Sequence, residues 1–451
     1  MFFEVCSMFR RRMSRREAIS TAAKIGISIA VAGVAAGVGG YYVGSLLAKP
    51  PKKPVEKKLA IYHWWTAGGE REAIDALYEG FKEYYPGVEI IDNPAAGGGG
   101  GVMRAAVMTM LIAGQAPDTF QLTYGKGQFL PWIKFLEPVD DIWGDYPVPD
   151  AVKDYGILEG HVWGIPINTM RFNDLWYNKK LVEEIGIDVD SIKTHEDLYE
   201  AFDKAKAAGY IPLAVGTGKG QKFWHLVMEC SVLCAVKHGG PEYLEKLYTG
   251  KAEPEKDEAI REMLEVFKTI WERGYVNPDY ATLTWDEAGD LLVDGKAVFN
   301  LMGDWQLGHF MSVGWKPGVD VDFISWPGTE HVFIMNYDCF VLPKEAPHKP
   351  VARKWLEYIK TNDAQLRFNL LKGSFSPRLD APIDKYNVCT KKAIANFRDP
   401  KTKLVGCPWG LPPAKWLDIM PDPLDAFVVH RDIDKGVEEY AAAYRKIFPK
   451  K

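Results

Sequence analysis

Two adjacent tryptophans, Trp64 and Trp65, are the residues of this chain with the clearest chemistry. They follow a short apolar stretch, residues 59–63, and precede a glycine-containing turn and the start of a helix. This pattern predicts two large aromatic rings at the carboxyl end of a strand, the edge where open α/β sheets bind ligands. An indole ring at that edge suits the apolar C–H face of a sugar. The alternative is that one ring fills the core and the other caps it, because Trp is highly buried on average.

Alternating strands and helices are predicted around this pair. Apolar stretches predict strands over residues 59–63, 88–91 and 118–122, separated by amphipathic helices. The second helix is expected over residues 102–113, and Gly114 is placed to cap it. Such alternation predicts parallel strands that are joined by right-handed crossovers.

A second unit of strand and tryptophan occurs later in the chain. Residues 297–301 are predicted to form a strand that runs into Asp304 and Trp305. A second lobe that faces the first would place Trp64, Trp65 and Trp305 around one cleft. Asp304 lies between a glycine and a tryptophan, so we interpret it as a cap or turn residue rather than a ligand.

Two glycine-rich segments do not fit the pattern of a phosphate-binding loop. Residues 97–101 and 216–220 both lack the GxGxxG spacing, and neither is followed by the Gly-Lys-Ser/Thr ending of a phosphate loop. We interpret the first segment as a mobile loop, because uninterrupted glycine is conformationally free rather than preorganised.

The composition is that of an ordinary globular protein. A chain of 451 residues with 47% hydrophobic and 25% charged residues can bury two sizeable cores, which favours two lobes. The formal net charge of −5 excludes the basic footprint of a nucleic-acid binder. The 15 Trp and 21 Tyr exceed what a core alone needs, so some rings are expected to line a surface or cleft.

The N-terminus reads as a targeting segment. Arginines between residues 10 and 16 precede an uncharged span, residues 25–48, that is long enough to cross a bilayer. The arginines are expected to stay in the cytoplasm, which places the rest of the chain outside. Ser14-Arg15-Arg16 also resembles a twin-arginine export signal. We expect an uncleaved anchor rather than a cleaved signal, and Cys6 precedes the span, which argues against a lipid anchor. Residues 49–58 read as a stiff Pro/Lys linker.

No metal or cofactor site is predicted. The nine histidines are scattered, and no cysteine pair has zinc-ligand spacing. Cys230 and Cys234 lie one helical turn apart in an apolar stretch and are expected to be buried thiols. Cys339, Cys389 and Cys407 allow one disulfide in an oxidising compartment, but the sequence does not select the pair.

Five short segments, taken together and in their order along the chain, resemble segments of a known protein family. They read HWWTAGGERE (63–72), APDTFQ (116–121), GIPIN (164–168), GKAVFNLMGDW (295–305) and LLKGSFSPRLD (370–380). The sequence resembles the family 1 extracellular solute-binding proteins of carbohydrate ABC importers and is closest to the bacterial glucose-binding branch.

The resemblance implies an α/β fold of the periplasmic-binding-protein type. Two lobes would be joined at a hinge by strands that cross near residues 167–171 and 323–327, and would close on the ligand like a clamp. The implied organisation is an export signal or anchor (1–48), a linker (49–58), an N-terminal lobe (59–168 plus 326–365) and a C-terminal lobe (169–325 plus 366–451).

The resemblance also implies a set of sugar-binding residues. In the glucose-binding branch, the Trp pair, the acid after it, the Gln that ends the third strand, two later Trp residues, an Asp and a Lys contact the sugar. Two histidine positions of the branch differ here: Thr123 replaces one, and the other region reads Cys407-Pro408-Trp409, which leaves the identity of the sugar open. The expected ligand-binding residues are Trp64, Trp65, Glu70, Gln121, Trp285, Trp305, Asp338, Lys372 and Trp409.

The residue types suit sugar hydroxyls, which both donate and accept hydrogen bonds. Asp338 and Glu70 would accept, Lys372 would donate and Gln121 could do both. Two alternatives stay open. Glu70 lies in the first turn of a predicted helix and could satisfy its N-terminus. Lys372 precedes Gly373 and could be a charge at a helix C-terminus.

The predicted function is capture of a mono- or oligosaccharide outside the cytoplasm and its delivery to an ABC transporter permease, from a membrane anchor and without catalysis. One alternative is a secreted glycoside hydrolase, which also uses Trp platforms but needs two carboxylates across the scissile bond. Another is a binder of a non-sugar solute such as a peptide or polyamine.

Overall fold

A computed structural model describes residues 57–96, 100–218 and 222–450 of the chain. The predicted signal or anchor (1–48) and most of the predicted linker (49–58) lie outside the described residues, as does the centre of the glycine run at 97–99. Within the described part, no helix combines the length and the apolar character that a membrane span requires.

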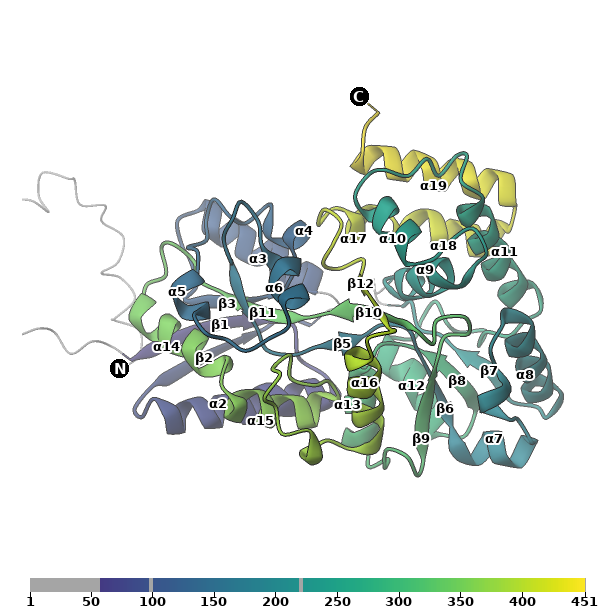
Figure 1. Cartoon of the computed structure of the whole chain (residues 1–451), viewed down its shortest axis with the longest axis horizontal. Coiled ribbons are helices and arrows are strands. Elements are labelled where there is room, and N and C mark those ends of the chain that lie inside the picture. Colours follow the sequence, from purple (N-terminus) through teal and green to yellow (C-terminus); the bar gives the residue numbers. More distant parts are fainter. Residues whose placement is uncertain (1–56, 97–99, 219–221, 451) are drawn as a thin grey trace, which may run out of the picture. The chain divides into compact units, whose positions relative to one another are not determined.

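The first sheet has five strands in the order β2-β1-β3-β11-β4 (Figure 1). Strand β1 pairs in parallel with both β2 and β3, while β11 is antiparallel to β3 and β4. The predicted parallel arrangement of the first three strands is therefore confirmed. The bounds are β1 Lys58–His63, β2 Glu89–Pro94, β3 Thr119–Thr123, β4 Gly164–Pro166 and β11 Asp338–Val341.

Helix α2 (Gly68–Tyr84) follows the tryptophan pair and buries Ile74, Leu77 and Phe81, which recur at helical spacing. It packs against α14 and α15. Gly114 has φ +71° just beyond α3 and so occupies the left-handed cap position that the sequence predicts. The other helices of this part are α3 Gly101–Ile112, α4 Lys126–Phe129, α5 Asp140–Trp143, α6 Asp150–Gly156, α14 Lys349–Ile359 and α15 Asn362–Lys372.

A second sheet has the strand order β7-β8-β6-β9. Its strands are β6 Asp174–Asn178, β7 Ile211–Ala214, β8 Ala297–Leu301 and β9 Val321–Ser325, so the predicted strand over 297–301 is confirmed. Its neighbouring helices are α7 Lys179–Ile185, η2 Val189–Ser191, α8 His195–Ala207, α12 Trp285–Val293 and α13 Trp305–Ser312.

The remaining helices include α9 and α11, which pack against α18 and α19. Their core is strongly apolar: α9 buries nearly its whole length, including Cys230 and Cys234, as the sequence predicts. All five cysteines of the described residues are buried free thiols. The bounds are α9 Trp224–Ala235, α10 Pro241–Tyr248, α11 Glu258–Glu272, η3 Ile383–Lys385, α16 Val388–Arg398, α17 Trp416–Ile419, α18 Pro421–His430 and α19 Ile433–Ile447.

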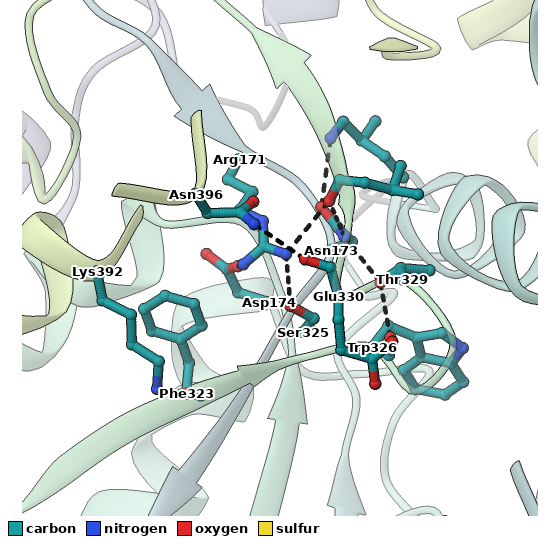
Figure 2. A network of polar contacts seen from close by, with 12 residues as sticks. Arg171, Asn173, Asp174, Phe323, Ser325, Trp326, Thr329, Glu330, Lys392 and Asn396 are labelled. Atoms are coloured by element: carbon teal, nitrogen blue, oxygen red, sulfur yellow. Dashed lines mark hydrogen bonds and ion pairs between the residues drawn. The ribbon is translucent and has the colours of Figure 1, made fainter. Parts of the chain in front are cut away.

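A small third sheet, β12-β10-β5, lies where the chain passes between the two larger ones. It consists of β5 Met170–Arg171, β10 Val332–Asn336 and β12 Lys403–Gly406. The chain runs from β4 through β5 to β6, and returns from β9 through β10 to β11. Figure 2 shows the polar network at these crossings, in which Arg171 forms an ion pair with Asp174 and donates a hydrogen bond to Ser325.

Candidate ligand-binding site

A cavity of about 360 Å³ brings together residues from elements across the described chain. Its wall carries six aromatic rings, four carboxylates and one lysine. Seven of the nine residues that the sequence predicts for the site line it, while Trp65 and Gln121 do not. The lining residues are Trp64, Thr66, Ala67, Glu70, Ala96, Thr123, Met170, Phe172, Phe223, Thr284, Trp285, Asp286, Glu287, Trp305, Asn336, Asp338, Lys372 and Trp409.

The two adjacent tryptophans divide between the cavity and the core. The backbone N–H of Trp64 donates to Gln121 Oε1 at 3.1 Å, which fixes the chain where the Trp64 ring meets the cavity. The ring of Trp65 is fully buried and packs on Phe368, with ring centroids 4.6 Å apart. Trp65 therefore lies in the core, as the alternative interpretation of the pair foresaw for one ring. Successive side chains of an extended chain point to opposite faces, which explains the division.

Gly100 gives the Trp64 ring its space. A Cβ atom at this position would come within 2.2 Å of the indole, and the backbone has φ +72°, a conformation that favours glycine. Gly100, at this end of the glycine run just before α3, thus allows the backbone to pack closely against the Trp64 ring.

Asp338 is a buried carboxylate that two amide groups hold in place. Gln121 Nε2 donates to its Oδ1 at 3.0 Å, and Asn168 Nδ2 donates to its Oδ2 at 2.8 Å. Burial raises the pKa of Asp338, and the positive charge of Lys372 opposes that shift. Gln121 lies behind the wall and joins the Trp64 backbone to this carboxylate, so its geometry is that of a positioning residue rather than a lining residue.

Glu70 and Lys372 form an ion pair on the cavity wall, with 2.7 Å between Lys372 Nζ and Glu70 Oε1. Glu70 lies in the first turn of α2, yet no side chain makes a cap hydrogen bond there. Lys372 is the last residue of α15 and is almost fully buried, with its ammonium 5.9 Å from the centre of the Trp305 ring. Burial raises the pKa of Glu70, and Lys372 lowers it. Both side chains thus face the cavity instead of only completing helix ends.

Two further tryptophans begin helices. Trp285 starts α12, where Thr284 and Glu287 form a capping box, and Trp305 starts α13 shortly after β8. Asp304 occupies the N-cap position of α13 but makes no side-chain cap bond, and it lies off the cavity wall. Burial raises the pKa of Asp304 well above its usual range.

The second glycine-rich segment has a packing role in the described structure. A Cβ atom on Gly216 would come within 2.1 Å of the Thr284 carbonyl oxygen, and one on Gly218 would meet the Thr282 backbone at 2.3 Å. These glycines let two loops approach closely just before Trp285. Residues 219–221 of the segment lie outside the described residues.

An aromatic row forms another part of the wall. The ring of Phe172 lies 5.0 Å from that of Trp305 and 4.9 Å from that of Trp409, and Phe223 lies 5.7 Å from Trp409. Sequence reasoning found the two tryptophans and missed the phenylalanines. Phe172 and Phe223 lie in loops without a motif, so no local signal marks them.

The predicted set also lacks six polar lining residues, namely Thr66, Thr123, Thr284, Asp286, Glu287 and Asn336. Asn336 lies two residues before Asp338, and Asp286 and Glu287 directly follow Trp285, so proximity to predicted residues was the available signal. Among the described residues, no group of three or more histidine, cysteine or acidic side chains is arranged to hold a metal ion.

Comparison with known proteins identifies related chains. A family model for bacterial extracellular solute-binding proteins matches residues 67–366. An uncharacterized ABC transporter extracellular-binding protein of Pyrococcus horikoshii is 37% identical over 88% of this chain and 90% of its own. A probable sugar-binding periplasmic protein of Mesorhizobium japonicum is 31% identical over 76% of this chain and 81% of its own. Among solved structures, a bacterial solute receptor with an exclusive preference for β-D-galactopyranose matches with TM-score 0.74 and 19% identity, over 87% of this chain and 99% of its own, which shows the shared fold.

Proposed function

Because this chain belongs to the bacterial extracellular solute-binding proteins, we propose that it captures a carbohydrate outside the cytoplasm and delivers it to the permease of an ABC transporter. The proposal includes an N-terminal anchor, residues 1–48, that holds the protein on the outer face of the membrane. The sugar leaves the site chemically unchanged. The name of the Mesorhizobium japonicum relative, a probable sugar-binding protein, supports this class of ligand.

The observation that carries the proposal is the meeting of indole rings and carboxylates in one cavity. Trp64 and Trp305 supply aromatic surface. The carboxylates of Asp338 and Glu70 supply hydrogen-bond acceptors, and Lys372, the partner of Glu70, supplies a donor. A sugar ring has apolar C–H faces and a rim of hydroxyl groups, so it needs both kinds of contact. Hydrogen bonds to charged groups are stronger than neutral ones, which favours tight capture.

Ligand capture by closure is part of the proposal. The proposed lobes, 59–168 plus 326–365 and 169–325 plus 366–451, would move about the chain crossings at β5 and β10. Because α15 is one helix that packs along α2, the boundary at 365 is better placed after its last residue, Lys372. Cavity residues come from both proposed lobes, with Trp64 and Asp338 from one and Trp285 and Trp305 from the other. A ligand that contacts both lobes only when they are closed shifts the equilibrium toward the closed form.

Isothermal titration calorimetry on the full-length protein in detergent tests the proposal with a panel of neutral sugars. At least one sugar should bind, and Trp64→Ala or Trp305→Ala should weaken its binding by about tenfold or more, on the order of 1–2 kcal/mol. Tyr84→Ala is the matched control, because Tyr84 is an exposed aromatic residue of α2 outside the cavity. Mass spectrometry after long incubation should recover the sugar intact.

Two results would overturn this function. Release of shorter products by the purified protein would indicate a glycoside hydrolase instead. Binding of peptides or polyamines with no binding of any neutral sugar would indicate a different solute.

A further inference from the structure

We propose that the cavity contains a second sugar subsite, formed by Phe172, Trp409 and Phe223, and that the ligand is therefore a disaccharide or a longer saccharide rather than a single sugar. This inference rests on the proposed function, because it specifies which carbohydrate the site takes. It concerns a part of the wall distinct from the ion pair and carboxylate described above.

The number of aromatic rings on the wall is the first argument. A single pyranose has two faces, so two rings are enough to enclose it. The cavity presents six rings, four indoles and two phenyl groups. Its volume of about 360 Å³ lies within the range of about 300–1,000 Å³ that is typical of small-molecule sites. Phe223 is half-buried and Trp409 is 5% exposed, so both keep some surface toward the cavity that a second sugar unit would cover.

The order of the rings gives the subsite its direction. Trp305 lies where two parts of the wall meet: the Lys372 ammonium is 5.9 Å from its ring centre on one side, and the Phe172 ring is 5.0 Å away on another. From Phe172 the row continues to Trp409 at 4.9 Å and to Phe223 a further 5.7 Å on. The row thus leads from the polar end of the cavity, which contains Lys372 and its partner Glu70, into an aromatic end.

Chain segments that are remote in sequence build this aromatic end. Phe172 lies between β5 and β6, Trp409 follows β12, and Phe223 precedes α9. Phe172 contacts both Trp305 and Trp409, so it connects the two ends of the row. The rings are tilted or edge-on to one another, with interplanar angles of 55° to 80°, and so do not stack as one block. Edge-on packing of this kind holds each ring by its neighbour. Phe172 is 1% exposed and so supports Trp305 and Trp409, while Phe223 is half-buried and keeps surface for a ligand.

Asn336 supplies the polar group that a second sugar unit requires. Its side chain lines the cavity, and its Oδ1 accepts from the Cys407 thiol at 3.4 Å, which orients the amide. Among the described residues the amide makes no other hydrogen bond, so its N–H groups can donate to a hydroxyl. Asn336 and Asp338 both line the cavity. Because only one residue separates them, their Cα atoms are at most about 7 Å from each other. The same stretch of chain thus offers one polar group to each sugar unit.

The chemistry of this end favours a neutral unit. The subsite residues Phe172, Trp409 and Phe223, with Asn336 and Met170 beside them, carry no charge. Aromatic and amide side chains of this kind do not neutralise a desolvated ammonium group, so they favour a neutral sugar unit over a polyamine. A sugar hydroxyl rim and an apolar ring face match the amide and the aromatic rings.

Calorimetry on the full-length protein in detergent tests the inference by pairing each monosaccharide with its own 1,4-linked disaccharide: glucose with maltose and cellobiose, and xylose with xylobiose. At least one disaccharide should bind at least about tenfold more tightly than its monosaccharide. Trp409→Ala should reduce that ratio by about tenfold, because it removes a central ring of the subsite. Phe223→Ala provides a second variant at a half-buried ring, should Trp409→Ala fail to fold. Tyr84→Ala should leave the ratio at its wild-type value.

The possible outcomes separate this inference from the proposed function. If a monosaccharide binds as tightly as each disaccharide that contains it, the second subsite is overturned and sugar capture stands. If the disaccharide preference is present but unchanged in both Trp409→Ala and Phe223→Ala, the subsite lies elsewhere and this assignment is overturned. If no neutral carbohydrate binds, the proposed function itself fails.

Discussion

The ligand cavity and the strand crossings both bury charged side chains, and they differ in what satisfies the charge. At the crossings, Arg171 and Asp174 are almost fully buried and form an ion pair at 3.0 Å. Arg171 Nη2 also donates to Ser325 Oγ at 2.7 Å, and its guanidinium lies 5.7 Å from the rings of Phe323 and Phe333. In Figure 2, Asp174, Ser325 and Phe323 lie around the guanidinium. The protein itself therefore supplies the partners of this charge.

In the cavity, the charged groups have protein partners on one side and the open volume on the other. Asp338 receives two amide donors from behind and lines the cavity in front. Burial raises its pKa, which means that the folded protein bears a cost for keeping the carboxylate charged. The comparison indicates that the crossing pair serves the geometry of the chain, while the cavity carboxylate keeps part of its bonding capacity for a ligand.

The largest expected effect comes from breaking the crossing pair. Arg171→Met should lower the free energy of unfolding at pH 8 by about 3–5 kcal/mol, because it leaves the Asp174 carboxylate buried without its cation. Urea denaturation followed by circular dichroism measures the change. The double variant Arg171→Met/Asp174→Leu is the control, since replacing both partners by apolar groups should restore most of the loss. Equal loss in the single and double variants would contradict an electrostatic cause.

The pH dependence of the same variant gives a second check. Burial raises the pKa of Asp174, and Arg171 opposes that shift, so the variant should have a still higher folded-state pKa. A carboxyl whose pKa is raised in the folded state lowers the free energy of unfolding as pH rises, because the unfolded chain releases the proton first. The pKa of Asp174 in the wild-type fold is already raised to about 7, so the deficit relative to wild type should stay constant below about pH 7 and grow above it, by at most about 1.4 kcal/mol per pH unit. A deficit that is constant with pH would indicate lost packing instead.

In the cavity, the same logic predicts a change in binding rather than in folding. Asp338→Asn should weaken sugar binding by about tenfold or more, since a hydrogen bond to a charged group contributes about 1.5–3 kcal/mol. Its free energy of unfolding should change by less than about 2 kcal/mol. Relief of the carboxylate's desolvation offsets the mismatch of the new amide with the Gln121 or Asn168 amide. Calorimetry and urea denaturation on one preparation measure both quantities, and a stability loss as large as that of Arg171→Met would remove the distinction between the two regions.

The part of the fold that could be predicted depends on local patterns. The strand over 297–301 and the parallel strands after the N-terminal linker follow from apolar runs, glycine caps and helical spacing, all of which lie within a few residues. The positions of Trp64 and Trp305 at strand ends follow from the same signals. The direction of each ring does not follow from these signals. Trp64 faces the cavity and Trp65 faces the core because successive side chains point to opposite sides, and the sequence does not say which side is which.

The rest of the site depends on contacts between distant segments. Phe172 and Trp409 are neighbours only because β5 and β12 flank β10 in the small third sheet, and no spacing rule connects them. The Arg171–Asp174 pair is close in sequence, but its burial depends on β9 and β10, which bring Ser325 and Phe333 over it. The roles of the site residues in binding stay predictions, which the variants above test.

The smallest expected effect is for an exposed arginine that undergoes the same substitution as Arg171. Arg367 on α15 donates to Glu83 of α2 at 2.7 Å and to Asp363 at 3.0 Å, so it has carboxylate partners as Arg171 does. Its side chain is 36% exposed, whereas that of Arg171 is 1% exposed. Water can solvate the carboxylates that Arg367→Met leaves behind, so the free energy of unfolding should fall by less than about 1 kcal/mol. Raising the salt concentration should shrink even that difference, because exposed pairs are screened. A loss comparable to that of Arg171→Met in urea denaturation would show that pairing, and not burial, sets the cost of removing an arginine from this fold.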